Sequence, residues 1–395
     1  MREWKKYKLS EIATLSNGIN FDKSAYTSGV KLIGVADFKD RIYPDYESLQ
    51  EVDSKVVRMG DYLEKGDIVF VRSNGNKELV GRCMMIDREI PVTYSGFCIK
   101  LHLIDKALFE PVYFNYLFRT RQFRKAMIGT AVGANIQNLS QARLGNCEVN
   151  VPEIETQNSI ATILSRYDTL IENYQKQIKL LEEAAQRLYK EWFVELRFPG
   201  HENTKIVDGL PEGWEMKRLV DFAKVTMGQS PKSEFYNNER NGLPFHQGVG
   251  SYGNRFVVDE TYSTSYTRIA EPNSVLFSVR APVGRLNITK NKIVIGRGLA
   301  AMTHVDGCQS FLYYLLKERF FKDNIIGNGA IFASISKDEL LNLKFMIPTD
   351  ELTYKFNDIA GNIDDAIMKA DNQIRLLAEA RDRLLPRLMG GEMEV

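Results

Sequence analysis

The sequence predicts a mixed α/β (α+β) protein built as a tandem duplicate. Two similar globular domains are each followed by one long helix, and the helices are expected to pair as an antiparallel coiled coil about a pseudo-twofold axis. Three observations lead to this prediction: an internal repeat, a heptad pattern after each globular segment, and the length of the segment between the halves. The expected boundaries are domain 1 at 1–153, helix 1 at 154–194, a linker at 195–213, domain 2 at 214–348, helix 2 at 349–390 and a tail at 391–395.

The repeat has the same order of elements in both halves. Residues 4–26 align without a gap with residues 214–236, and Gly18 coincides with Gly228. In the middle, residues 66–72 resemble residues 273–280 only if a gap is opened, which pairs Arg72 with Arg280. Chance similarity between two helices would not reproduce this order.

The alignment becomes ungapped again at an offset of 196 residues and continues to the end of both helical segments. Residues 177–188 and 373–384 are identical at 8 of 12 positions. The repeat is therefore strongest in the helices and weakest in the middle of each domain.

Each helical segment follows a strand-like run that ends at Pro152 or Pro348. Apolar residues then alternate in steps of four and three, which is the a/d pattern of a coiled coil and is broken only by Arg381. The expected seam is Ile160, Leu164, Tyr167, Ile171, Tyr174, Ile178, Leu181, Leu188, Phe356, Ile363, Ile367, Ile374, Leu377, Leu384 and Leu388.

The linker favours an antiparallel pair. A helix of this length would be ~60 Å long, and the 19 residues of the linker would have to be almost fully stretched to retrace it. An antiparallel arrangement needs no such stretch, and it places the two domains at opposite ends of a rod.

Each globular domain is expected to mix helices and strands. Domain 1 reads as a helix at 9–15, strands at 67–71, 98–103 and 147–151, and a helix at 111–127. Domain 2 reads as a helix at 219–225, strands at 275–279, 293–295, 299–302 and 343–347, and a helix at 309–321.

Composition limits the classes of function. No stretch of ~18 apolar residues predicts a membrane span, and four scattered cysteines are typical of reduced thiols in a cytoplasmic protein. Both globular segments carry an excess of Lys and Arg, and both helical segments carry an excess of Asp and Glu. This partition suits anion-binding domains on an acidic frame.

Motifs of catalysis are not found in the sequence. There is no P-loop, no convincing GxGxxG after a strand, no GxSxG elbow and no Asn/Asp-Pro-Pro-aromatic run. The four histidines, His102, His201, His246 and His304, have no metal-ligand spacing, so we expect them to be structural or solvated and expect no metal in this chain. The chain is therefore expected not to be an enzyme.

The duplicated order resembles a known family. A Trp-x4-Leu opening, a variable domain, a strand closed by Pro, and a helix with Gln-Ile-Lys/Arg-Leu-Leu occur twice, and Leu-Pro-Glu-Gly-Trp opens the second half at 210–214. This arrangement resembles the specificity subunit of type I restriction-modification systems along nearly the whole chain. The resemblance implies that each domain reads one half of a bipartite double-stranded DNA target.

The resemblance also implies partners. The helices would set the half-site spacing and dock two methyltransferase subunits, and restriction-translocase subunits would join them. S-adenosylmethionine, ATP and magnesium would bind to those partners, with no cofactor in this chain. Two alternatives stay open: a duplicated scaffold that does not bind DNA, and an orphan recognition subunit of a related defence system.

Loop residues with hydrogen-bonding side chains are the candidates for contact with DNA, because Arg and Lys suit guanine, Asn and Gln suit adenine, and all suit phosphates. The candidates are Lys23, Arg72, Asn74, Asn76, Lys77, Arg82, Asn135, Gln137, Asn138, Gln229, Ser230, Lys232, Arg280, Arg285, Arg297, Asn328, Ser334 and Lys337.

Overall fold

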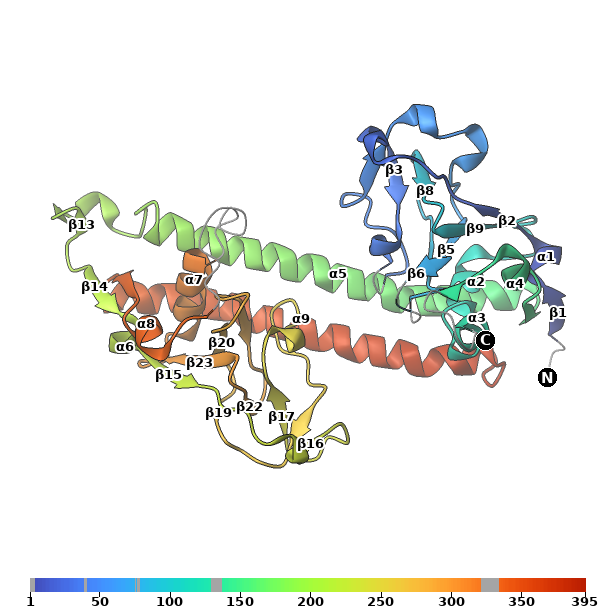
Figure 1. Ribbon diagram of the computed structural model, residues 1–395. Helices are drawn as coiled ribbons and strands as arrows, with labels where there is room; N and C mark the ends of the chain where they lie inside the picture. The colour runs from blue at the N-terminus through green and yellow to red at the C-terminus, as the bar shows by residue number, and fades with distance from the viewer. Residues whose placement is uncertain (1–3, 39–40, 75, 77–78, 129–136, 321–333) are drawn as a thin grey trace. The chain divides into compact units, whose positions relative to one another are not determined.

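The computed structural model describes residues 4–38, 41–74, 76, 79–128, 137–320 and 334–395 (Figure 1). The chain forms two compact units. Unit 1 comprises residues 1–174 and 372–395, and unit 2 comprises residues 175–371. Each unit therefore contains one globular part and one stretch of each long helix. No helix in the described ranges is long and apolar enough to cross a membrane.

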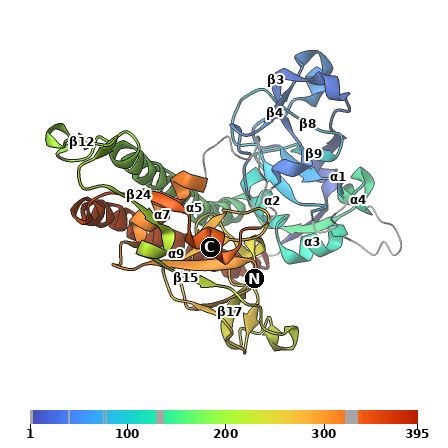
Figure 2. The same ribbon diagram turned by 60° about the vertical axis from the view of Figure 1, so that its left-hand side comes forward.

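Unit 1 contains two sheets. The first has the antiparallel order β2-β9-β5-β7, and the second, β4-β3-β8, forms a separate lobe in which β3 and β8 run parallel (Figure 2). The strands are β1 (Lys5–Lys8), β2 (Ala13–Asn17), β3 (Tyr26–Ile33), β4 (Gln50–Val52), β5 (Ile68–Val71), β6 (Ser73–Asn74), β7 (Cys83–Met85), β8 (Val92–Tyr94), β9 (Cys98–Leu103), β10 (Gln137–Asn138) and β11 (Glu148–Val151). The helices are α1 (Leu9–Ile12), α2 (Pro111–Leu117), α3 (Arg121–Ile128), α4 (Gln141–Gly145) and parts of α5 (Ile154–Phe193) and α9 (Asp350–Met389).

The central strand β5 shows how the core of unit 1 is divided. Successive side chains of a strand point to opposite faces. Ile68 and Phe70 therefore pack with the helices, α5 and α9 included, while Val69 and Val71 pack toward the second lobe. Because both faces are covered, β5 is apolar throughout and fully buried.

Unit 2 repeats this plan. Its main sheet has the order β15-β23-β20-β21, and a five-stranded second sheet has the order β16-β18-β17-β22-β19. The strands are β12 (Ile206–Val207), β13 (Leu210–Pro211), β14 (Glu215–Arg218), β15 (Ala223–Met227), β16 (Tyr236–Asn237), β17 (Leu243–His246), β18 (Tyr262–Ser263), β19 (Ile269–Ala270), β20 (Val275–Ser278), β21 (Leu286–Ile288), β22 (Ile293–Ile295), β23 (Leu299–His304) and β24 (Lys344–Ile347). The helices are α6 (Leu219–Phe222), α7 (Gln309–Phe320), α8 (Lys337–Leu341) and the remaining parts of α5 and α9.

Both ungapped blocks of the repeat correspond to equivalent elements. The segments β1, α1 and β2 match β14, α6 and β15, and α4, β11 and α5 match α8, β24 and α9, residue for residue. The shared glycines have a steric role: a Cβ at Gly18 would lie 2.2 Å from the Tyr94 carbonyl oxygen, and one at Gly228 would lie 2.1 Å from that of Gly296. No side chain fits at either position.

The gap expected between residues 66–72 and 273–280 is wrong. The N–H groups of Gly66 and Asn273 donate to equivalent carbonyls of Ile86 and Thr289, and the ladder continues in step from there. Val279 therefore stands where Arg72 stands, and Arg280 stands where Ser73 stands. The sequence alignment had matched Val71-Arg72 with Val279-Arg280 because the residue types agree. The backbone hydrogen bonds place these two pairs one residue out of step.

Three expected helices are shorter than the pattern suggested. The segments 9–15 and 219–225 turn after one helical turn into β2 and β15, because these residues pair with β9 and β23. The helix at 111–127 is divided into α2 and α3. At the break, the Thr120 hydroxyl donates to the Leu117 carbonyl and accepts from the Phe123 N–H, so it caps α3.

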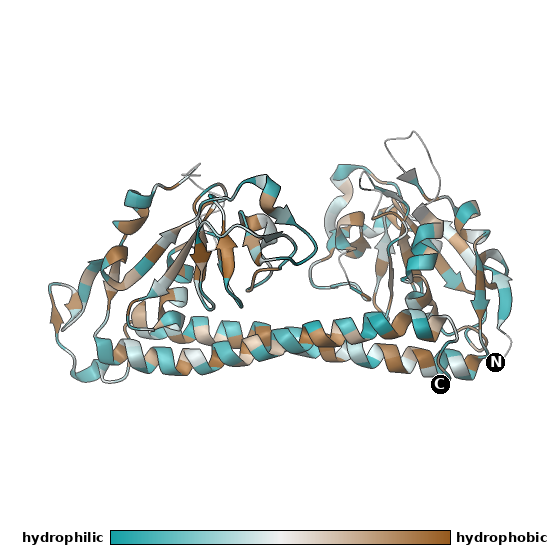
Figure 3. Ribbon diagram, turned by 90° about the horizontal axis from the view of Figure 1, so that it is seen from below, coloured by the Kyte–Doolittle hydropathy of each residue, from teal (hydrophilic) through white to brown (hydrophobic). Residues whose placement is uncertain are grey.

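The two long helices pair within each unit. In unit 1, Arg381 of α9 pairs with Asp168 of α5, and Leu388 shares a core with Ile160 and Leu164. In unit 2, the Phe356 ring of α9 lies 5.6 Å from the Tyr189 ring of α5. Late positions of one helix thus meet early positions of the other, so the pairing is antiparallel in each unit. All the expected seam residues are buried or half-buried, and Figure 3 shows hydrophobic patches recurring along both helices.

Arg381, which breaks the seam, completes a buried polar contact. The Tyr116 hydroxyl on α2 donates to one oxygen of Asp168, and the Arg381 guanidinium donates to the other. Burial, reinforced by the Asp168 carboxylate, raises the pKa of Tyr116, so the phenol stays protonated as a donor. We call the paired helices α5 and α9 the stalk, and the contact of Tyr116, Asp168 and Arg381 the stalk anchor of unit 1.

Unit 2 has a stalk anchor at the equivalent aspartate. The Tyr314 hydroxyl on α7 lies 2.8 Å from Asp364, the counterpart of Asp168. The cation here is Arg255, which comes from the globular part, is almost fully buried, and also lies 3.3 Å from Glu182 of α5. The Arg255 guanidinium is stacked 4.4 Å from the Tyr313 ring.

The segment at 195–213 is folded. Phe198 is buried and lies 5.2 Å from the Trp214 ring, and β12 and β13 form a short hairpin. It packs as part of unit 2.

Candidate nucleic-acid interface

In unit 1, segments from distant parts of the chain meet at the end of the central strand β5. Beyond β5, the Arg72 N–H donates to the Phe97 carbonyl over 2.8 Å, and the Arg72 carbonyl accepts from the Leu139 N–H over 2.8 Å. The strands β6 and β10 then pair Ser73 with Asn138 and Asn74 with Gln137. We call this region, from the strand end to the β8–β9 turn, the strand-exit edge of unit 1.

Polar side chains line this edge. The Arg72 guanidinium donates to the Gly96 carbonyl at 3.2 Å, so it braces the β8–β9 turn while remaining half-exposed. The side-chain amide oxygen of Asn74, Oδ1, accepts from the Asn76 backbone N–H at 2.8 Å. Asn138 is exposed beside Ser73. The edge therefore offers donors and acceptors that are held by backbone ladders.

Unit 2 builds its strand-exit edge on the same backbone bonds. The Val279 N–H donates to the Gly298 carbonyl, and the Val279 carbonyl accepts from the Ile335 N–H, both over 2.9 Å. Arg280 forms an isolated antiparallel bridge with Ser334, at the place where Ser73 pairs with Asn138 in the β6–β10 ladder of unit 1. The two edges share one frame and differ in the side chains they carry.

A hollow of about 160 Å³ occupies this edge in unit 2. Its lining includes Arg280 and Arg297 together with Gln247, Ser278 and Gly298. Gly298 stands where Phe97 stands in unit 1, and Phe97 is 62% exposed. One unit thus presents an aromatic side chain where the other presents a cavity.

The electrostatics of the hollow favour an anionic or hydrogen-bonding ligand. Both Arg280 and Arg297 are exposed, and within the described ranges neither lies within salt-bridge distance of a carboxylate. Guanidinium groups in this state are free to pair with phosphates or with guanine, and Gln247 can pair with adenine. The arrangement is chemically suited to reading DNA.

The structure brings many of the sequence-predicted residues together. At the edge of unit 1 lie Arg72, Asn74, Asn76, Asn138 and, through its backbone, Gln137; at that of unit 2 lie Gln229, Ser230, Arg280, Arg297 and Ser334. Arg82 and Arg285 are one ladder step away, since their carbonyls accept from the N–H groups of Val71 and Ser278. Their contact with DNA stays a prediction.

Other predicted residues are placed elsewhere. Lys23, Lys232 and Lys337 are exposed at the starts of short helical turns, and Lys232 lies 4.0 Å from Glu234. Lys77, Asn135 and Asn328 lie outside the described residues.

Sequence reasoning missed Phe97 and Gln247. Phe97 lies in a Ser-Gly-Phe turn, where an aromatic residue outside a strand was the available signal. Gln247 opens a loop rich in glycine and follows a buried strand, which is the pattern that singled out the other candidates. Neither has a periodic apolar neighbour that would mark it as core.

A serine–histidine–aspartate contact next to Gln247 has a structural role. His246 Nδ1 lies 2.8 Å from the Ser251 hydroxyl and Nε2 lies 2.9 Å from Asp259, but the imidazole is fully buried. A side chain with no exposed surface cannot meet a substrate, so this contact clamps the loop that carries Gln247. The thiols are also poor nucleophiles, since burial raises the pKa of Cys98 to about 12 and of Cys308 to about 11.

Comparison with known proteins gives a consistent result. Residues 1–183 and 211–374 match the family described as the type I restriction modification DNA specificity domain. The putative type I restriction enzyme MjaX specificity subunit of Methanocaldococcus jannaschii is 29% identical over 98% of this chain and 88% of its own length. The HindI specificity subunit of Haemophilus influenzae is 21% identical over the full length of both chains.

One solved structure shares the fold. The S subunit of a type I restriction-modification system from M. genitalium superposes with a TM-score of 0.61 at 17% identity, covering 98% of this chain and 96% of that one.

Proposed function

Since the chain belongs to the type I restriction-modification DNA specificity family, we propose that it is the sequence-specific DNA-binding subunit of such a complex. Each unit reads one half of a bipartite duplex target with its strand-exit edge. The chain itself performs no chemistry.

One observation carries this proposal. The two units repeat the same hydrogen-bonded frame around Arg72 and Val279, yet the side chains on that frame differ. The edge of unit 2 carries Arg280, Arg297 and Gln247, and the edge of unit 1 carries Phe97 and asparagines. A frame kept twice with different polar side chains is what two readers of different sequences require, because base edges are distinguished by their donor and acceptor patterns. A duplicated scaffold would not need this divergence.

We further propose that α5 and α9 set the distance between the half-sites and dock methyltransferase subunits. Methylation and restriction then belong to partner subunits, which bind S-adenosylmethionine, ATP and magnesium. The complex works in the cytoplasm, in keeping with four free cysteines. The antiparallel pairing of the helices within each unit supports a stalk of fixed length.

The direct test is selection from randomised duplex DNA with the chain bound to the methyltransferase subunit of its own system. We expect enrichment of a two-part sequence with a constant spacer. Binding no better than to random competitor at moderate salt would leave only the scaffold alternative.

The stalk has its own test. Deleting residues 174–180 together with 370–376 removes one heptad from both helices at equivalent positions. We expect the spacer to shorten by about three base pairs, since one heptad is ~10 Å of helix. An unchanged spacer would contradict the role of the helices.

A further inference from the structure

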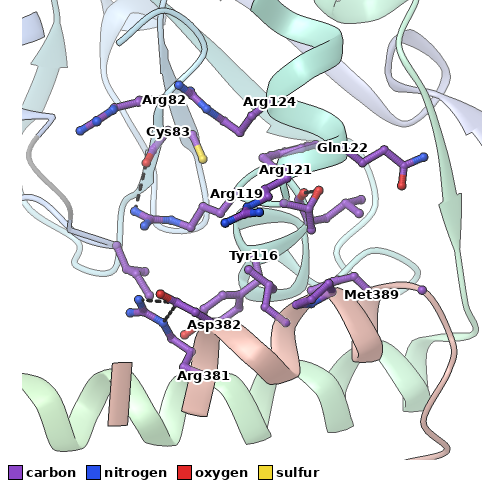
Figure 4. A pocket seen from close by; sticks show the side chains of 17 residues that line it. Arg82, Cys83, Tyr116, Arg119, Arg121, Gln122, Arg124, Arg381, Asp382 and Met389 are labelled. Atoms are coloured by element: carbon purple, nitrogen blue, oxygen red, sulfur yellow. Dashed lines mark hydrogen bonds and ion pairs between the residues drawn. The ribbon is translucent and has the colours of Figure 1, made fainter. Parts of the chain in front are cut away.

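A groove of about 860 Å³ opens in unit 1 on the side of the stalk anchor (Figure 4). It is bounded by the end of α2, the start of α3 and the last turns of α9. Its size lies within the ~300–1,000 Å³ typical of ligand sites. The strand-exit edge does not account for it, because of the residues placed at or beside that edge Arg82 alone lines the groove.

The rim of the groove is cationic. Arg82, Arg119 and Arg121 line it, and in the part of the chain that the structure describes none of the three lies within salt-bridge distance of a carboxylate. Arg119 is oriented by the carbonyls of Arg41 and Cys83, and Arg121 is exposed. The acidic side chain in the lining, Asp382, is already paired with Arg381.

Apolar side chains also line the groove, and we call them its floor. They are Ile42, Leu385 and Met389, the last two from the end of α9. A sugar–phosphate strand would neutralise the rim, but its phosphates would gain nothing from this floor. A ligand that matches both the arginines and the apolar side chains must carry carboxylates and a large apolar group.

Unit 2 shows what fills the equivalent place. Leu385 and Met389 correspond to Tyr189 and Phe193 of α5, both of which are buried. Thr120 corresponds to Glu318, whose carboxylate lies 2.9 Å from the Gln186 amide and 3.9 Å from the Lys190 ammonium. In unit 2 the chain itself therefore supplies two aromatic rings and a carboxylate.

We propose that the groove of unit 1 holds an acidic segment of a partner protein, with one large apolar side chain on the floor and carboxylates against Arg119 and Arg121. This rests on the proposed function, because the partner is a subunit of the complex that the chain assembles. Since unit 2 fills its own counterpart, the two halves of the chain bind their partners differently.

The test uses the full chain and the methyltransferase subunit of its system. Arg121→Glu reverses the charge of an exposed rim residue, and Lys125→Glu makes the same change on an exposed residue of α3 outside the groove. We expect Arg121→Glu to weaken assembly about tenfold or more, and Lys125→Glu to change it less than about twofold. Thermal unfolding checks that both variants fold.

A second variant fills the groove with side chains of the chain itself. Thr120→Glu combined with Leu385→Tyr introduces the residue types that stand at the equivalent positions of unit 2, so these side chains occupy the space that the partner segment needs. We expect assembly to weaken as much as with Arg121→Glu, and a fluorescent methyltransferase subunit titrated against each chain measures both.

Two results would overturn the proposal. The first is that neither Arg121→Glu nor the double variant changes the affinity of the chain for the methyltransferase subunit. A flatter dependence of DNA affinity on salt in Arg121→Glu, with normal assembly, is the other, because it would assign the groove to phosphates. Failure of the proposed function is distinct, since the wild-type complex would then select no DNA sequence.

Discussion

In both units a tyrosine of the globular part forms a hydrogen bond with an aspartate of a long helix. The cation that neutralises this aspartate differs between the units. Tyr116 bonds Asp168 in unit 1 and Tyr314 bonds Asp364 in unit 2, at equivalent positions. The cation is Arg381 of the helix in one case and the buried Arg255 of the globular part in the other. Both units therefore pair an aspartate of the long helix with a tyrosine and a cation, and they differ in the element that supplies the cation.

The largest effect expected from this comparison is in unit 2. Arg255→Met should destabilise that unit by about 3–5 kcal/mol, because it removes a buried guanidinium that pairs with both Asp364 and Glu182 and stacks on the Tyr313 ring. Arg381→Met should cost unit 1 less, since the Arg381 side chain is 23% exposed and that of Arg255 is 2%. Hydrogen exchange resolved by peptide measures each unit separately. Equal losses in the two units would mean that burial does not distinguish the anchors.

A substitution in the hollow of unit 2 tests whether the two strand-exit edges read their half-sites independently. A Cβ at Gly298 would lie 2.4 Å from the Gln247 carbonyl oxygen, so Gly298→Ala must displace the loop that carries Gln247. We expect the half-site read by unit 2 to lose about 1–3 kcal/mol of discrimination while the other half-site is unaffected. Quantitative binding to a panel of single-base variants of the selected site measures this. Loss in both halves would show that the edges do not read independently.

Much of the fold could be predicted because the repeat and the heptads are long and regular. The helices α5 and α9 lie where the a/d pattern placed them, and the repeat blocks match element for element. The helix expected at 9–15 ends at Ile12, because pairing of residues 13–17 with β9 outweighs local helical periodicity. Thr120, whose hydroxyl ends α2 and caps α3, was an available signal for the break in the helix expected at 111–127.

The candidate site was predictable only in part. Arg280 and Arg297 were singled out by residue type, but their meeting with Gln247 in one hollow depends on strands far apart in the sequence. The equivalence of Arg72 and Arg280 was wrong, because the backbone register that separates them is set by bonds to β7 and β21. Residue type identifies such candidates, and tertiary pairing decides which of them meet.

Phe97 provides a smaller test of the same comparison. Because its side chain is 62% exposed, Phe97→Ala should leave the folding stability nearly unchanged. It should weaken binding to the half-site of unit 1 by about 1 kcal/mol through lost apolar contact with bases. Titration of labelled duplex at fixed salt measures this, with Met59→Ala as the control at an exposed apolar residue away from the edge. Equal effects of the two substitutions would remove Phe97 from the interface.

The smallest expected effect is on pH dependence. Burial lowers the pKa of His304, whose counterpart in unit 1 is Leu103. A histidine with a lowered folded pKa contributes its full stability above the unfolded pKa of ~6.5, and this contribution is lost as pH falls from that value toward the lowered folded pKa. Exchange in β15 and β23 should therefore rise by a few fold between pH 7 and pH 5.5, relative to β2 and β9. His304→Leu should abolish the difference, and a difference that persists would have another source.

If each unit reads its own half of the target with its strand-exit edge, a change to the arginines of the hollow in unit 2 affects one half-site alone. The most direct measurement is the set of methylated sites, mapped genome-wide, in cells whose complex carries Arg280→Gln with Arg297→Gln. We expect one half of the bipartite sequence to become degenerate while the other half and the spacer stay as in the wild type. Sites unchanged in both halves, or degenerate in both, would contradict it.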